Sequence, residues 1–185
     1  MSADVIAASE ERMKKSLGSL KDSFAGLRTG RAQASLFDKI KVNAYGSPTP
    51  LNQVANISVP EARLIVIQPW DKSQIGEIEK AIRASELSLN PSNDGKVIRI
   101  SIPPLTGERR KELVKQAKAQ AEQSRVAIRN IRRDGNDELK KLLKEGIITE
   151  DDESKGAADL QKKTDSYIEQ VQKVLDEKEK EITEQ

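Results

Sequence analysis

The chain has 185 residues, of which 34% are charged and 3% aromatic, and its formal net charge is +2. It contains no Cys and no His, which excludes disulfides, thiolate metal sites and Ser-His-Asp or Cys-His catalysis within the chain. No apolar run approaches the roughly 20 residues of a membrane span, and the N-terminus lacks the apolar block of a signal peptide. We therefore expect a soluble cytoplasmic protein built on long amphipathic helices, with no cofactor and no metal site.

The prolines divide the chain into parts. All seven lie between Pro48 and Pro104, and proline breaks helix interiors. The flanks can therefore be long helices, whereas the middle cannot. We predict a discontinuous three-helix bundle from residues 1–30 and 105–185, and a small α/β domain from residues 31–104.

Each flanking helix carries one apolar seam at heptad-like spacing, and three such seams can bury one another in a bundle. The first helix is predicted over about residues 4–27, with Gly30 as a stop signal and Met13, Leu17, Leu20, Phe24 and Leu27 as its seam. The second is predicted over about 106–145, with the seam Leu113, Ala117, Ala121, Ser124, Ile128, Ile131, Gly135, Leu139 and Leu142. Gly135 is explained equally by close helix packing and by flexibility.

The third helix is predicted to start near Thr149, because Thr149 and Asp152 have the spacing of a capping box. Its predicted seam is Ala157, Leu160, Thr164, Tyr167, Val171, Val174 and Ile182. The acids of residues 150–153 could hold a divalent metal, but acids at a helix start usually complement the helix dipole, and we favour that interpretation.

The inserted segment has the short, branched, alternating runs that are typical of strands, and one helical run interrupts them. Strands are predicted within residues 39–45, 54–59, 63–68 and 97–102, and a helix within 73–87. Residues 47–50, "SPTP", indicate a turn. Trp70 is expected in the core or at the rim of the small domain, with a protein-contact patch as the alternative.

Two connections, "RTGRA" (28–32) and "PPLTG" (103–107), join the small domain to the bundle. They lie at one end of the bundle if the first two helices are antiparallel, and two adjacent single-chain connections make a hinge. The string "RTGR" is interpreted as a helix stop and linker, with a phosphate contact as the alternative.

The second flanking helix has a one-sided charge pattern. At about 100° per residue, basic residues lie beside the seam on one side: Lys111, Lys115, Lys118, Arg125, Arg129, Arg132, Arg133 and Lys140. Glu122 alone among the acids shares that arc. Residues 105–146 carry twelve basic against seven acidic residues, net +5, and residues 147–185 carry six against twelve, net −6. We call the eight basic residues the basic face.

A basic face favours a polyanion, and the arginine fork matches phosphate. The alternative is a solvated surface whose arginines pair with the acidic third helix. Because the acids lie away from the arginines, we favour nucleic acid. With so few aromatic side chains, contacts to the backbone of folded RNA fit better than stacking on single strands.

Four colinear strings make the chain resemble the bacterial ribosome recycling factor family over essentially its whole length: "LRTGRAQASLFDKIKVNAYGSPTPLNQVANISV" (27–59), "IEKAIRASELSLNP" (78–91), "PPLTGERRKELVK" (103–115) and "RVAIRNIRRDGNDELKKL" (125–142). The resemblance implies an α+β fold, with an elongated three-helix bundle and a small inserted β/α/β domain in an L-shaped, tRNA-like arrangement. It also implies a factor that splits the post-termination ribosome into subunits together with elongation factor G, which hydrolyses the GTP.

The resemblance also implies residue roles. The string "RNIRRD" matches the basic patch of the family, so Arg132 and Arg129 are the first candidates for ribosomal RNA contacts. Arg125 and Arg133 follow, then Arg110, Arg28 and Arg31 near the hinge. The predicted hinge residues are Gly30, Arg31, Pro103, Pro104 and Leu105. The implied partners are the large ribosomal subunit and elongation factor G, with no DNA and no membrane.

The chain is expected to be a monomer and not an enzyme. One other class stays open on the residues alone, a coiled-coil protein that binds client proteins through its acidic helix. A metal-dependent hydrolase using the acids of 150–153 is disfavoured, because a second cluster of metal ligands is missing. The departures from the family pattern at Ser88, Gly107 and Gly135 lie outside the arginine patch.

Overall fold

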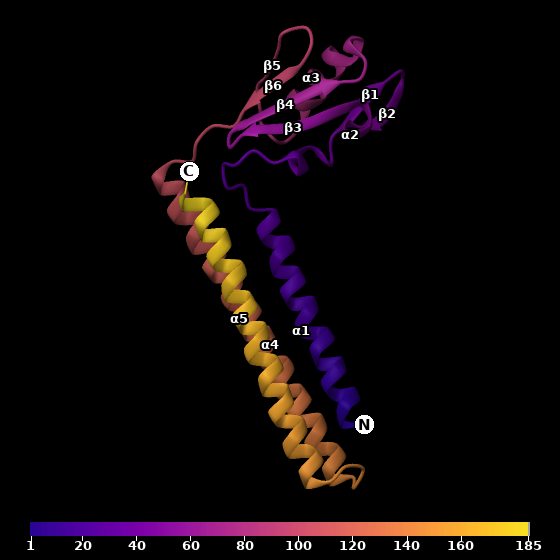
Figure 1. Ribbon diagram of the computed structural model, residues 1–185, viewed down its shortest axis with the longest axis vertical. Coiled ribbons are helices and arrows are strands. Elements are labelled where there is room, and N and C mark those ends of the chain that lie inside the picture. The colour runs from indigo at the N-terminus through magenta and orange to yellow at the C-terminus, as the bar shows by residue number, and fades with distance from the viewer. Residues whose placement is uncertain (185) are drawn as a thin grey trace. The chain divides into compact units, whose positions relative to one another are not determined.

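A computed structural model describes residues 1–184, which form two compact units. The helical unit contains residues 1–28 and 107–184, and the small unit contains residues 29–106. Figure 1 shows long helices in the first and a sheet with short helices in the second. The predicted α+β class is confirmed. None of the helices formed by residues 1–184 has the length and apolarity needed to cross a bilayer.

Three helices make up the helical unit: α1 (Ser2–Ala25), α4 (Gly107–Lys144) and α5 (Glu150–Thr183). Every pair of these helices is in contact, and α4 runs antiparallel to both of its neighbours (Figure 1). Contacts of Ser9 with Gly135 and of Ser16 with Ser124 fix the α1–α4 pairing. The C-terminus of α1 and the N-terminus of α4 therefore lie at the same end of this unit.

The seams predicted for α1 and α4 are confirmed, apart from their last residues. Met13, Leu17, Leu20 and Phe24 are buried against Ala117, Ala121, Ile128 and Ile131 of α4 and against Val171 and Leu175 of α5. Leu27 and Leu142 are only partly buried. The predicted end of α1 was wrong, because the helix stops at Ala25 with Gly26 as its C-cap. Gly30 lies beyond it with φ +75°, a conformation suited to glycine.

A tight turn joins α4 to α5. Gly146 has φ +70°. Its N–H donates to Leu143, and the N–H of Ile147 donates to Leu142, which is the Schellman pattern that ends a helix. Thr149 then starts α5. The predicted capping box is confirmed, since Thr149 Oγ1 accepts from the Asp152 backbone N–H and Asp152 accepts from the Thr149 backbone N–H.

The seam predicted for α5 was partly wrong. Leu160, Thr164, Val171 and Ile182 are buried as expected, but Tyr167, Val174 and Ala157 are only partly buried. Leu175 and Lys178 take buried positions instead. The Lys178 ammonium remains paired with Glu181 at 3.0 Å, and its alkyl chain covers apolar surface, as long basic side chains often do.

Six strands and two α-helices make up the small unit. Strands β1 (Lys41–Ala44) and β2 (Ser47–Pro50) form a hairpin, and α2 (Leu51–Val54) follows. An antiparallel sheet in the order β3-β4-β6-β5 contains β3 (Ala55–Glu61), β4 (Leu64–Pro69), β5 (Pro91–Asn93) and β6 (Ile98–Ser101). Helix α3 (Ile75–Ala84) and the short 3-10 helices Ala34–Phe37 and Lys72–Gln74 complete the unit.

Period-two burial along the strands builds the core of the small unit. Ile65 and Ile67 of β4 and Ile98 and Ile100 of β6 are fully buried, while Arg99 between them is exposed. Helix α3 contributes residues at helical spacing, and the whole core cluster includes Phe37, Val42, Leu51, Ile75, Ile78 and Ile82. The strands and the helix predicted for this segment are therefore confirmed in outline.

One prediction for the small unit was wrong, and another is narrowed. Residues 47–50 form strand β2 rather than a turn, and the turn lies at Tyr45 and Gly46, with φ +51° and +82°. A two-residue turn with both φ values positive matches the twist of the strands it joins. Of the positions predicted for Trp70, the core is excluded, because the side chain is 70% exposed, and the rim and the protein-contact patch stay predictions. Tyr45 is 78% exposed.

Candidate nucleic-acid interface

The packing of α4 determines where its basic face lies. Ile128 and Ile131 are buried in the seam, so residues some 40° to 140° around the helix from Ile128 emerge along one side of α4. Lys118, Arg125 and Arg132 recur every seven residues and reach α5. Their contacts with α5 go to Glu179, Gln172 and Gln161 respectively.

Arg132 is held by a neutral partner. Its Nη1 donates to Gln161 Oε1 at 2.7 Å, and Gln161 Nε2 donates to Asp165 Oδ1 at 2.8 Å. The amide therefore orients the guanidinium and leaves its charge uncancelled by direct pairing. Arg132 Nε is buried and has no hydrogen-bond partner among residues 1–184.

Arg125 has a similar arrangement and is more deeply covered. Its Nη2 donates to Gln172 Oε1 at 2.6 Å, and Gln172 Nε2 donates to Asp176 Oδ1 at 2.7 Å. Its Nη1 donates to Glu122 at 2.9 Å, and the side chain is only 16% exposed. Arg125 thus has a structural role at the α4–α5 seam, in addition to its predicted role in binding RNA.

Arg129 lies further out and is 43% exposed. Its Nη1 donates to Glu122 Oε1 at 3.2 Å. Hydrogen bonds from Arg125 and then Arg129 hold the pKa of the Glu122 carboxyl below its usual value. Glu122 is therefore a carboxylate at neutral pH.

Arg133 is exposed on the outer edge of the basic face. Within the part of the chain that the structure describes, no hydrogen bond or ion pair involves its side chain. The acids near this stretch are directed elsewhere, since Asp134 pairs with Arg12 of α1 at 2.8 Å and Glu112 pairs with Arg109 at 2.9 Å. Among the residues of α4 on the basic face, Glu122 is therefore the one acid, and Glu179 of α5 adds a second through its pair with Lys118.

The other basic candidates come from different segments. Arg110 is half-buried in the first turn of α4, and its Nε is buried without a hydrogen-bond partner among residues 1–184. Arg28 is exposed beyond α1 in the helical unit, and Arg31 is exposed in the small unit. The binding roles of these three arginines stay predictions.

The hinge candidates Gly30, Arg31, Pro103, Pro104 and Leu105 belong to the small unit. Nearby, the Ala32 N–H donates to the Ala62 carbonyl and the Ile102 N–H donates to the Arg63 carbonyl, each at 2.8 Å. These bonds tie both connecting segments to the β3–β4 loop. Both connections therefore leave the sheet at one place.

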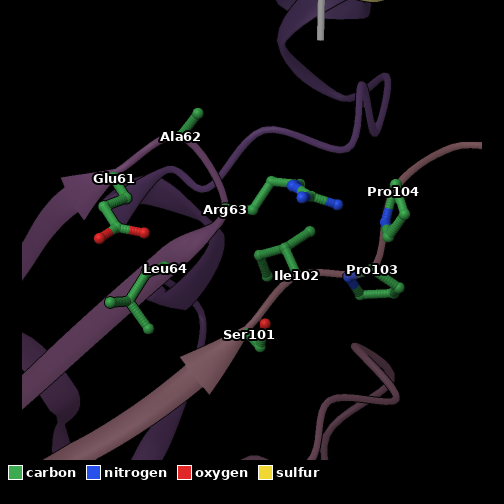
Figure 2. Close-up of a pocket in the computed structure, with 8 residues that line it drawn as sticks. All are labelled: Glu61, Ala62, Arg63, Leu64, Ser101, Ile102, Pro103 and Pro104. Atoms are coloured by element: carbon green, nitrogen blue, oxygen red, sulfur yellow. The ribbon is translucent and has the colours of Figure 1, made fainter.

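A pocket of about 410 Å³ lies at that place, and Figure 2 shows its lining residues. Arg63 extends across it toward Pro104, whereas Glu61 points the other way. Ile102, Pro103 and Leu64 contribute apolar surface. The pocket thus combines one cation with the prolines of the predicted hinge.

Two of the acids at the start of α5 are held by other partners. Asp152 is engaged in the capping box, and Asp151 pairs with Lys155 at 2.7 Å. No group of three or more His, Cys, Asp or Glu within residues 1–184 is arranged to hold a metal ion. The structure thus gives no support to the metal-dependent hydrolase.

The glutamines of α5 are the site residues that sequence reasoning missed. Gln161 and Gln172 each lie four residues before an aspartate, on a helix that looks acidic overall. That repeated Gln-x-x-x-Asp spacing was the only feature of the sequence that could have indicated these glutamines as partners of the arginines. Pairing with α4 depends on the register of two antiparallel helices, and the charge pattern alone does not provide it.

Comparison with known proteins gives one family. The sequence model described as "Ribosome recycling factor" matches residues 20–183. A ribosome-recycling factor of Treponema denticola is 63% identical over 175 residues, covering 95% of each chain.

Two solved structures are similar as well. A solution structure of a ribosome recycling factor matches with TM-score 0.78 and 44% identity, covering 100% of this chain and 98% of that one. The second is a model of the T. thermophilus factor and E. coli elongation factor G bound to the E. coli post-termination complex. It matches with TM-score 0.65 and 47% identity, covering 98% of each chain.

Proposed function

Because this chain belongs to the ribosome recycling factor family, we propose that it acts with elongation factor G to split the post-termination ribosome into subunits. Splitting frees mRNA and tRNA for a new round of translation. The proposal is supported by similarity over nearly the whole chain, and by the related factor described with elongation factor G on a post-termination complex. This activity would place the protein in the cytoplasm, as a monomer on each ribosome.

The basic face of α4 is proposed to anchor the helical unit on ribosomal RNA of the large subunit. The observation that carries this step is the set of four arginines from Arg125 to Arg133, beside which the acids other than Glu122 are turned away or paired elsewhere. Gln161 and Gln172 hold Arg132 and Arg125 without cancelling their charge. Oriented guanidinium groups suit phosphate oxygens, and they lose less conformational entropy on binding.

The proposed role is mechanical rather than catalytic. The chain has no His or Cys, and GTP hydrolysis is assigned to the partner. Two connections join the units, with Gly30 in one and Pro103 and Pro104 in the other. We infer that the small unit swings about these residues while the helical unit stays on the RNA, and that this movement weakens the contacts between the ribosomal subunits.

Co-sedimentation with large ribosomal subunits over a salt series tests the anchor. Arg132→Ala and Arg129→Ala should each weaken binding and reduce the slope of log affinity against log salt by about one phosphate contact. Lys141→Ala is the matched control, because Lys141 is an exposed cation on another side of α4. Unchanged binding by both arginine variants would remove the basic face from the function, and salt-insensitive binding to a client protein would favour the coiled-coil alternative.

A further inference from the structure

Glu122 lies between two arginines of the basic face. Its Oε2 accepts from Arg125 Nη1 at 2.9 Å, and its Oε1 accepts from Arg129 Nη1 at 3.2 Å. Each carboxylate oxygen thus has its own guanidinium. Two arginines that converge on one anion in this way also suit a phosphate group, whose two non-bridging oxygens can be shared in the same manner.

The two arginines are held differently. Arg125 is fixed by its second hydrogen bond to Gln172 of α5 and is largely covered. Arg129 is more exposed, and Glu122 is its one hydrogen-bond partner among the described residues. One side of the anion site is therefore rigid, and the other can adjust to a ligand.

The carboxylate between them can leave at little cost. The Glu122 side chain is 53% exposed and extends from the same helix, so rotation into solvent moves no backbone. The pair of Glu122 with Arg129 is exposed on both sides, and such pairs contribute little to stability because water and salt screen them. The covered Arg125 keeps its hydrogen bond to Gln172 when the carboxylate leaves. A phosphate with further contacts nearby can displace this carboxylate, and the two anions repel each other if both stay.

We propose that Arg125 and Arg129 form a binding site for one RNA backbone phosphate, and that Glu122 occupies it as an internal competitor. This inference rests on the proposed binding of ribosomal RNA and adds the residue that limits it. Any RNA phosphate that enters this site must displace Glu122. An RNA that offers a single phosphate gains little, whereas one that also reaches Arg132 and Arg133 is bound. Glu122 would thus favour the right RNA over others by penalising weak contacts.

The test compares Glu122→Gln with Glu112→Gln on large ribosomal subunits across a salt series. Glu112 is a matched control because it also pairs with an arginine three residues away, is 59% exposed, and lies off the basic face. Glu122→Gln should tighten binding about two- to fivefold, the change that corresponds to one surface ion pair. It should also steepen the salt slope, whereas Glu112→Gln should change neither quantity.

A second pair of variants separates the outcomes. The gain in affinity from Glu122→Gln should be smaller in the Arg129→Ala background, because that gain comes from freeing the Arg129 side chain. If Glu122→Gln binds no more tightly than wild type while Arg129→Ala still weakens binding, Glu122 does not compete with RNA. The proposed function would be unaffected by that result. Unchanged binding by Arg129→Ala and Arg132→Ala would instead remove the basic face, and the phosphate site with it, from the proposed function. Circular dichroism of each variant checks that the helices are intact.

Discussion

Gly135 of α4 lies directly against Leu160 of α5. A Cβ at position 135 would lie 2.8 Å from Leu160 Cδ1, and also 2.8 Å from Ser9 Oγ of α1. The arrangement is reciprocal four residues along each helix, where a Cβ at Gly156 of α5 would lie 2.9 Å from Leu139 Cδ1 of α4. Each helix thus provides a gap that the other fills with a buried leucine. Close packing, rather than flexibility, accounts for Gly135.

This packing makes the effect of a methyl group at position 135 depend on residue 160. Leu160→Ala should destabilise the helical unit by about 2–5 kcal/mol, because it leaves a cavity. Gly135→Ala in that background should recover up to about 1 kcal/mol, since the methyl enters the cavity and alanine favours the helix, less the cost of the remaining contact with Ser9 Oγ. Alone, Gly135→Ala should gain nothing or lose up to about 2 kcal/mol through overpacking.

Wild type, the two single variants and the double variant form a double-mutant cycle. Urea denaturation followed by circular dichroism measures the free energy of unfolding of each. Gly18→Ala is the control, because a Cβ at Gly18 of α1 meets nothing within 4 Å. It should therefore show the gain from helix propensity by itself. Additive effects of Gly135→Ala and Leu160→Ala would contradict the direct contact.

The capping box at the start of α5 should contribute measurably to stability. Thr149→Ala removes the hydroxyl that accepts from the Asp152 N–H and donates to the Asp152 carboxylate. The free energy of unfolding of the helical unit should fall by about 1 kcal/mol. Ser154→Ala, an exposed change one turn later, should have little effect in the same denaturation experiment. Equal losses for both variants would argue against the cap.

Asp94 should stabilise the β5–β6 turn in a way that depends on pH. Its carboxylate accepts from the Val97 N–H, from Arg99 Nη1 and from the Lys96 N–H, and these bonds hold its pKa far below the usual 3.8. A depressed pKa means that the stabilisation is present in full above pH 3.8 and is lost only as the pH falls toward the folded-state pKa. Asp94→Asn should therefore lower the denaturation midpoint at neutral pH, and the difference from wild type should shrink only in strong acid.

Trp70 is the single tryptophan and lies in the small unit, so its fluorescence follows this unit during denaturation. Asp38→Asn provides a control at an exposed aspartate of the same unit. A difference between wild type and Asp94→Asn that persists unchanged at the lowest pH would show that the carboxylate charge is not its cause.

Gln161 should orient Arg132 for binding without contributing charge. Gln161→Ala removes the 2.7 Å hydrogen bond to Arg132 Nη1. It should weaken binding to large ribosomal subunits about two- to tenfold, the usual range for one hydrogen bond, and leave the salt slope unchanged. Gln123→Ala, at an exposed glutamine on another side of α4, is the control. A change of slope for Gln161→Ala would show that the glutamine does more than orient its partner.

The sequence predicted the helical unit well where each apolar stripe was narrow. In α1 and α4 the seam residues recur at regular steps, and the structure buries nearly all of them. In α5, Tyr167, Ile168, Val171, Val174 and Leu175 are spread over a wide arc, so the stripe could be drawn in more than one way. Lys178 was missed because an alkyl stem and its charged end are covered to different degrees.

Other errors have equally local causes. "SPTP" contains two prolines and reads as a turn, yet an edge strand tolerates proline, and two residues with positive φ before it make the actual turn. Trp70 follows a buried strand, so a core position was one expectation for it, but its side chain is exposed and only that part of the prediction is excluded. For the basic face, helix periodicity placed the arginines on one side. Their glutamine partners depend on how α4 packs against α5, which one-dimensional periodicity does not contain.

The interruption of the helical unit by the small unit has a consequence for synthesis on the ribosome. Met13 of α1 packs in one cluster with Ile128 of α4 and Val171 of α5, which are translated much later. All core residues of the small unit lie within 29–106, so this unit can fold as soon as its own segment has emerged. Helix α1 is translated before α4 and α5, so its apolar stripe has no partner to bury it until those two helices have been made.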